Sequence, residues 1–302
     1  MRLFAWTIAV ASACCFGSSH AQELTGTLKK IKETGSITLG VRESSIPFSY
    51  LDDKQAFRGY SIDLCARITA EIQRRLGLKT LDVKLQPITS ATRIPLMTNG
   101  TIDLTCGSDA NTLDRQKQVA FSYTTFIGNS SFVAKKSSKV NSVNDLKGKT
   151  VVSTSGSTDV KQITDLSKER DLGLKVVVGP DHGASFAMME TGRATAFVIT
   201  DILAASQLAN AKNPGDFAIT IIDEIPVEPW ALMMRKDDPA FKALVDGVLA
   251  DTFKSGEIKK LYATWFQSPL PTLNVNLGIA MSKKLQNAVA IPNDSGDPKD
   301  YK

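Results

Sequence analysis

The sequence predicts an α/β protein with two lobes, each a sheet flanked by helices. Short apolar runs alternate with helical patterns along the 302-residue chain, and this alternation restarts near residue 126. Such alternation is typical of a mainly parallel sheet with helices on its faces. We expect the last two helical patterns, 239–255 and 257–266, to return to the first lobe. The chain would then cross between the lobes twice, which makes a hinge and places a cleft where small ligands bind.

The first lobe is predicted to begin with a strand at 36–41 (SITLGV). Residues 61–76 predict a helix, because apolar residues recur there at spacings of three and four. These apolar residues are Ile62, Cys65, Ile68, Ile72 and Leu76. Further strands are expected at 83–88 and 102–106, and a helix at 93–98 that ends before Asn99-Gly100.

A second α/β unit is expected after the first. Its predicted strands are 131–134, 150–153, 175–178 and 195–199, and its predicted helices are 159–170, 183–190 and 201–211. We therefore place the first lobe at 22–127 plus 228–268 and the second lobe at 128–227. Residues 269–302 contain several prolines and a Gly-Asp-Pro-Lys-Asp stretch, so we expect an extended, partly disordered C-terminal tail.

Composition indicates a folded, soluble protein. Hydrophobic residues make up 42% of the chain and charged residues 22%, which excludes both a disordered and a fibrous protein. The formal charge is +5, but the Lys and Arg residues are dispersed among 31 acids. Without a basic block interleaved with aromatic residues, we expect no nucleic-acid partner. A small positive charge suits an anionic ligand.

The N-terminus predicts export. Residues 1–21 have a basic start at Arg2, a short apolar run and a Ser19-His20-Ala21 end that suits signal peptidase. We expect cleavage before Gln22 and a periplasmic mature protein. A lipid anchor at Cys14 is a less favoured alternative, because Ala11 stands where such signals carry leucine.

Two cysteines, Cys65 and Cys106, remain in the mature chain. An even number in an oxidising compartment allows a disulfide, while two buried thiols are the alternative. The mature chain has one histidine, and no ligand spacing in it suggests a metal site. We expect no metal and no cofactor.

Short motifs stand out at 41–50 (VRESSIPFSY), 87–96 (PITSATRIPL), 106–108 (CGS), 114–118 (DRQKQ), 181–183 (DHG) and 190–194 (ETGRA). These motifs resemble those of the periplasmic glutamate/aspartate-binding proteins of ABC importers, within the polar amino-acid-binding family. The resemblance extends over residues 35–267. The resemblance implies a two-lobe periplasmic-binding-protein fold of type II. It also implies a monomer with an inner-membrane ABC permease as its partner.

The resemblance also implies two carboxylate sites, and arginine suits both because its planar fork matches a carboxylate. The ligand's backbone carboxylate would meet Arg115 and Ser108. Its distal carboxylate would meet Arg42, Ser90, Arg93 and His182. In the second lobe Thr158, which follows a run of small residues, would reach the ligand. Plain alternatives are solvated surface arginines and a helix N-cap at Thr158.

The sequence departs from the resemblance at the ligand's ammonium. Thr200 stands where the family has an aspartate, and Ala110 stands where the acidic-ligand branch has a threonine. Two interpretations follow. Either Asp201, Asp109 or Asp159 replaces the missing acid, or the ligand is a dicarboxylate without an amine.

An enzyme and a sensory protein are the alternatives to a transport binding protein. Some relatives of this fold are enzymes, but we find no Ser-His-Asp ordering and no metal set, so we expect no enzymatic activity. A sensory protein that presents its ligand to a membrane receptor has the same sequence features as an import protein. An enzyme would alter its ligand during prolonged incubation, whereas a binding protein would not.

Overall fold

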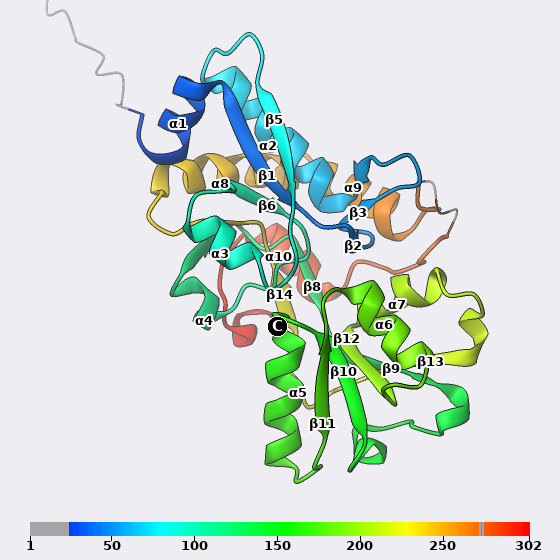
Figure 1. Cartoon of the computed structure of the whole chain (residues 1–302). Coiled ribbons are helices and arrows are strands. Elements are labelled where there is room, and N and C mark those ends of the chain that lie inside the picture. The colour runs from blue at the N-terminus through cyan, green and yellow to red at the C-terminus, as the bar shows by residue number, and fades with distance from the viewer. Residues whose placement is uncertain (1–23, 272, 274) are drawn as a thin grey trace, which may run out of the picture.

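The computed structural model describes residues 24–271, 273 and 275–302. Two five-stranded sheets form two lobes, with strand orders β5-β1-β6-β15-β7 and β11-β10-β12-β9-β13 (Figure 1). In each sheet three neighbouring strands are parallel and the remaining strands pair antiparallel. The predicted α/β class with two lobes is confirmed. The expected signal peptide, 1–21, lies outside the described residues.

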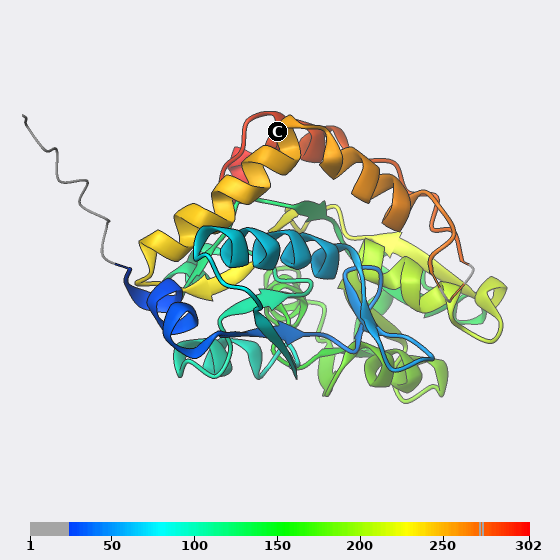
Figure 2. The same ribbon diagram turned by 90° about the horizontal axis from the view of Figure 1, so that it is seen from above.

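The first lobe contains the predicted elements with small shifts at their ends. Its sheet consists of β1 (Ser36–Val41), β5 (Asp82–Pro87), β6 (Leu104–Cys106), β7 (Val119–Phe121) and β15 (Met233–Arg235). Its helices are α1 (Gly26–Thr34), α2 (Tyr60–Arg75), α3 (Arg93–Thr98), α4 (Leu113–Gln116), α8 (Pro239–Lys254) and α9 (Glu257–Phe266). A small sheet joins β2 (Ser44–Ser45), β3 (Ser49–Leu51) and β4 (Phe57–Arg58). Both α8 and α9 pack on α2, so the expected return to the first lobe is confirmed (Figure 2).

The second lobe is built in the same way. Its strands are β9 (Ser130–Lys135), β10 (Thr150–Thr154), β11 (Lys175–Gly179), β12 (Ala196–Thr200) and β13 (Phe217–Ile221). Its helices are α5 (Thr158–Glu169), α6 (His182–Glu190) and α7 (Asp201–Ala209). Helices α5 and α6 each follow a strand after a short turn, whereas α7 follows β12 directly.

Two antiparallel strands connect the lobes. Strand β8 (Phe126–Gly128) pairs with β14 (Glu228–Trp230), so both crossings of the chain lie side by side. We keep the boundaries between 127 and 128 and between 227 and 228 as our proposed division of the lobes.

Aromatic packing fixes these two strands to the first lobe. The ring of Phe48 lies 4.9 Å from the rings of both Phe126 and Trp230, measured between centroids.

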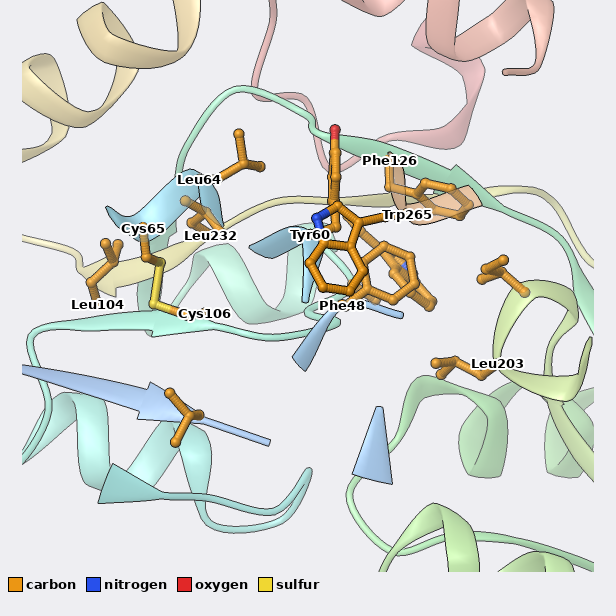
Figure 3. Close-up of a cluster of buried hydrophobic side chains, with 14 of the residues drawn as sticks. Phe48, Tyr60, Leu64, Cys65, Leu104, Cys106, Phe126, Leu203, Leu232 and Trp265 are labelled. Carbon is orange, nitrogen blue, oxygen red and sulfur yellow. A yellow bond between two sulfur atoms is a disulfide. The ribbon is translucent and has the colours of Figure 1, made fainter. Parts of the chain in front are cut away.

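Nearby, a disulfide joins Cys65 on α2 to Cys106 at the end of β6 (Figure 3). Since Cys106 precedes the predicted site residue Ser108 by two positions, the disulfide also fixes the backbone directly before Ser108.

The C-terminal residues differ from the extended, partly disordered tail that we expected. They form helix α10 (Lys283–Ala290) and the short 3-10 turn η4 (Pro298–Asp300). Leu285, Ala288 and Val289 share one buried face of α10, a spacing that the neighbouring prolines obscure in the sequence. The penultimate residue, Tyr301, is buried, and its hydroxyl lies 2.6 Å from the hydroxyl of Thr124.

Replacing Tyr301 by alanine should lower the free energy of unfolding by about 3 kcal/mol, because a buried aromatic ring is lost. Tyr301→Phe is the matched control. It removes only the hydroxyl contacts with Thr124 and with the carbonyl oxygen of Ser295, and should cost about 1 kcal/mol. Urea denaturation measures both. Equal stability of wild type and Tyr301→Ala would show that the tail does not dock.

Candidate functional site

Most side chains predicted from the sequence meet where the two lobes face each other. Arg42 follows β1, Ser108 follows β6, and Thr200 ends β12, so each lies at the carboxyl end of a strand. This edge of an α/β sheet is where ligands usually bind. The predicted residues with exposed fractions of only 2% to 6% are Arg42, Ser90, Arg93, Ser108, His182 and Thr200. Burial of several charged groups together indicates a binding site, because such groups need partners.

Contacts between residues of the two lobes hold a closed arrangement. Arg42 Nη2 of the first lobe lies 3.4 Å from His182 Nε2 of the second. Arg115 Nη2 donates a hydrogen bond of 3.1 Å to the carbonyl oxygen of Gly156. A Cβ added to Gly156 would lie 2.5 Å from the Cα of Ala91, and the residue has φ +76°. Glycine therefore permits the two backbones to approach this closely.

His182 is neutral and orients Arg42. Burial, followed by the charges of Arg42 and Arg93, lowers the pKa of His182 well below its usual value. An arginine only donates, so Nε2 accepts from Arg42 and Nδ1 donates to Thr154 Oγ1 at 2.8 Å. Thr154 was not predicted, although it ends β10 directly before the run of small residues.

Arg42 can still bind an anion. Burial and then Arg93 lower the pKa of Arg42 to about 10, so it stays charged at neutral pH. Its Nη1 is buried and has no hydrogen-bond partner within the described part of the chain. A carboxylate at this position would satisfy that donor.

Arg93 is already paired. Its Nη1 donates to Asp109 Oδ1 and, at 3.1 Å, to the carbonyl oxygen of Ser108. Asp109, one of the acids considered for the ammonium, is therefore engaged by an arginine. The hydroxyl of Ser108 is buried and unpartnered among the residues that the structure describes, as is Asp109 Oδ2. Ser108 thus has a free hydroxyl beside the arginine.

Arg115 lies on α4, which begins after Thr112. The hydroxyl of Thr112 accepts a hydrogen bond from the backbone N–H of Arg115 and so caps this helix. The guanidinium donates to the carbonyl oxygens of Ala110, at 2.8 Å, and of Gly156. Burial and then Arg93 lower the pKa of Arg115 to about 9, which still leaves it cationic at pH 7.

Ser90 and Thr158 lie on opposite lobes near the same contact. Ser90 is in the turn before α3, and its backbone faces Gly156. Thr158 is the first residue of α5 and is partly exposed. Ser157 holds the N-cap position of that helix, so Thr158 is not the capping residue.

Asp201 is not brought to the arginines. Its two oxygens accept hydrogen bonds from the Asn129 side chain, at 2.7 Å, and from the backbone N–H of Ile202, also at 2.7 Å. The side chain is partly exposed and lies in the first turn of α7. One step along the chain, Thr200 is buried and points the other way, with its hydroxyl 3.5 Å from Glu228 Oε2. These contacts disfavour Asp201 as the acid that replaces the family's aspartate.

Two buried acids complete the site. Glu228, the first residue of β14, was not predicted, and Asp159 was named only as a possible ammonium acceptor. Both have an exposed fraction of 4%. A signal for Glu228 existed in the sequence, since it is the lone charge in the otherwise apolar stretch 225–234.

Other features of the surface do not compete with this site. A groove of about 930 Å³ runs between α8, α9 and α10, but its charged residues are dispersed lysines rather than a converging cluster. Within the described ranges, no group of three or more His, Cys, Asp or Glu side chains is arranged to hold a metal. No helix in those ranges is long and apolar enough to span a membrane.

Curated relatives resemble this chain over nearly its whole length. An L-glutamate/L-aspartate-binding protein of Pseudomonas aeruginosa is 42% identical over 95% of both chains. A glutamate/aspartate import solute-binding protein of Escherichia coli (strain K12) is 39% identical, again over 95% of both. Both relatives are named as binding proteins, and the second is named for import.

Solved structures agree with the fold. An ancestral arginine-binding protein bound to arginine has a TM-score of 0.68 and 26% identity, over 77% of this chain and 98% of that one. An ancestral amino acid-binding protein, described as a precursor of cyclohexadienyl dehydratase, has a TM-score of 0.67 and 26% identity, over 80% and 99%. Residues 37–268 match the model of the family described as bacterial extracellular solute-binding proteins, family 3. The chain therefore belongs to the family 3 bacterial extracellular solute-binding proteins.

Proposed function

We propose that the protein captures a small dicarboxylate of the glutamate and aspartate class between its lobes and delivers it to a membrane importer. The observation that carries this proposal is the convergence of Arg42, Arg93 and Arg115, of which only Arg93 forms an ion pair with a carboxylate in the described residues. Two arginines thus remain for two carboxylates. The names of the relatives that are 39% to 42% identical support the same ligand class.

The roles of the side chains follow from their positions. Arg42, Arg93, Ser90 and His182 would hold the distal carboxylate, while Arg115 and Ser108 would hold the other. Thr158 and His182 belong to the second lobe, so contacts to both lobes form together only on closure. A ligand that binds one arrangement more tightly shifts the population toward it, and the closed form would then dock on an inner-membrane ABC permease.

Export is part of the same proposal. A cleaved signal peptide at 1–21 would place the mature protein in the periplasm, in accordance with a family of extracellular proteins. Mass spectrometry of the secreted protein would test cleavage before Gln22. Retention of Cys14 with a lipid would instead indicate the anchored form.

Calorimetric titration of the ligand-stripped mature protein tests the ligand class. We expect L-glutamate or L-aspartate to bind, and L-glutamine and L-arginine, which lack the second carboxylate, to bind far more weakly. Recovery of the ligand unchanged after prolonged incubation would distinguish binding from catalysis. Tight binding of L-arginine without any dicarboxylate binding would refute the proposal.

A further inference from the structure

The carboxylates of Asp159 and Glu228 form an acidic cluster separate from the Arg93–Asp109 pair. Asp159 lies in the first turn of α5, and Glu228 begins β14 at the hinge. Gln162, three residues after Asp159 and on the same helix face, donates through Nε2 to Glu228 Oε1 at 2.9 Å. The helix therefore presents Asp159 toward Glu228.

Within the described ranges, the hydrogen bonds that these two acids accept come from neutral donors. Glu228 accepts hydrogen bonds from Gln162, from Trp230 Nε1 at 3.4 Å and from Thr200 Oγ1 at 3.5 Å. Asp159 Oδ1 is buried and has no hydrogen-bond partner among the residues that the structure places. None of the ion pairs in the described residues includes either carboxylate. Buried acids without a counter-charge are costly, so this cluster is suited to a cation.

The titration of Asp159 agrees with this arrangement. Burial, followed by the charge of Glu228 on β14, raises the pKa of Asp159 to about 8, against smaller opposing effects of Ser157 and of Arg115 on α4. Arg115 does not neutralise the cluster by direct contact, since its guanidinium donates to the carbonyl oxygens of Ala110 and Gly156. Arg115 therefore remains available to bind an anion. Asp159 and Glu228 remain available to bind a cation beside it.

We propose that Asp159 and Glu228 bind the ammonium group of the ligand, which makes the ligand an amino dicarboxylic acid rather than a plain dicarboxylate. This inference rests on the proposed function. An ammonium brings one positive charge and three N–H donors, so it can bond to both acids and favours the ionised form of Asp159. Thr200, at the position where the resembling family has an aspartate, here supports Glu228 with its hydroxyl. The acceptor has therefore moved from the end of β12 to α5 and the hinge strand.

The test compares L-glutamate with glutarate, which is the same molecule without its amine. Wild-type protein should bind L-glutamate at least about 30-fold more tightly than glutarate, because glutarate leaves both acids unpaired. In Asp159→Asn the affinity for L-glutamate should fall by about 30-fold or more, and the ratio of the two affinities should shrink to within about threefold. Glu228→Gln should act in the same direction.

Asp201→Asn is the matched control, because it removes a carboxylate adjacent to Thr200 that bonds to Asn129 instead of facing the site. It should leave both affinities unchanged. Thermal unfolding of each variant verifies that it is folded. Equal binding of both ligands by wild type, or full discrimination by both Asp159→Asn and Glu228→Gln, would overturn the ammonium site while the dicarboxylate proposal stands. Failure of wild type to bind either ligand would instead refute the proposed function.

Discussion

Replacing Arg115 by alanine should weaken binding of L-glutamate by about 30-fold to several thousandfold, which corresponds to about 2–5 kcal/mol. Arg115 is partly buried where the lobes meet, so water replaces the lost charge-assisted hydrogen bonds only in part. The same change removes the hydrogen bond from Arg115 to Gly156, which is one of the contacts between the lobes. Calorimetric titration measures the affinity directly.

Arg115 is a better choice for this experiment than Arg93. Removal of Arg93 would leave Asp109 buried without its ion-pair partner and would lower the stability of the protein. A loss of affinity could then not be separated from a loss of stability. Arg115 forms no ion pair within the described chain, and its two carbonyl acceptors are uncharged. The matched control is Arg74→Ala, an exposed arginine paired with Glu71, which should leave the affinity unchanged. Unaltered binding by a folded Arg115→Ala protein would remove the central element of the proposed site.

The sequence predicted the elements of the fold well wherever their patterns were local. Residues 93–98 and 257–266 were predicted with the bounds that α3 and α9 have in the structure. Their apolar spacing and terminal residues contain the necessary information. Helix α10 was missed, because its buried face consists of three residues within a stretch bounded by prolines. Only its packing against the rest of the protein explains why it is ordered.

The site was predictable in its cationic half and less so in its acidic half. Arg42, Arg93 and Arg115 stand in recognisable motifs, whereas Glu228 faces Thr200 and Gln162 from distant parts of the sequence. No local pattern brings those three residues together. Thr200 and Asp201 show a second limit, since successive residues at a strand end point in different directions. Thr200 faces Glu228 and Asp201 faces Asn129. The identities of the two residues alone do not reveal this difference.

Removal of the disulfide is the second change with a large expected effect, and the effect is a loss of stability. Cys65 and Cys106 are 41 residues apart and fully buried, and they tie α2 to β6. In the chain-entropy account, closing a loop of this length limits the unfolded state and stabilises the protein by about 4 kcal/mol. The double variant Cys65→Ala/Cys106→Ala should therefore unfold at a clearly lower urea concentration than the oxidised wild type.

Binding should respond far less than stability in that variant. Ser108 follows Cys106 closely, but its position also depends on β6 and on the hydrogen bond from Arg93 to its carbonyl oxygen. We expect the affinity for L-glutamate to change by no more than about threefold at temperatures where the variant is folded, because the ligand contacts in the closed form are unaltered. Wild type unfolded under reducing conditions provides the matched control, since it loses the crosslink without a change in sequence. If its stability equals that of the oxidised protein, and if free thiols are found in the oxidised sample, then the two cysteines are buried thiols, and the rigidity of the Ser108 loop arises from packing alone.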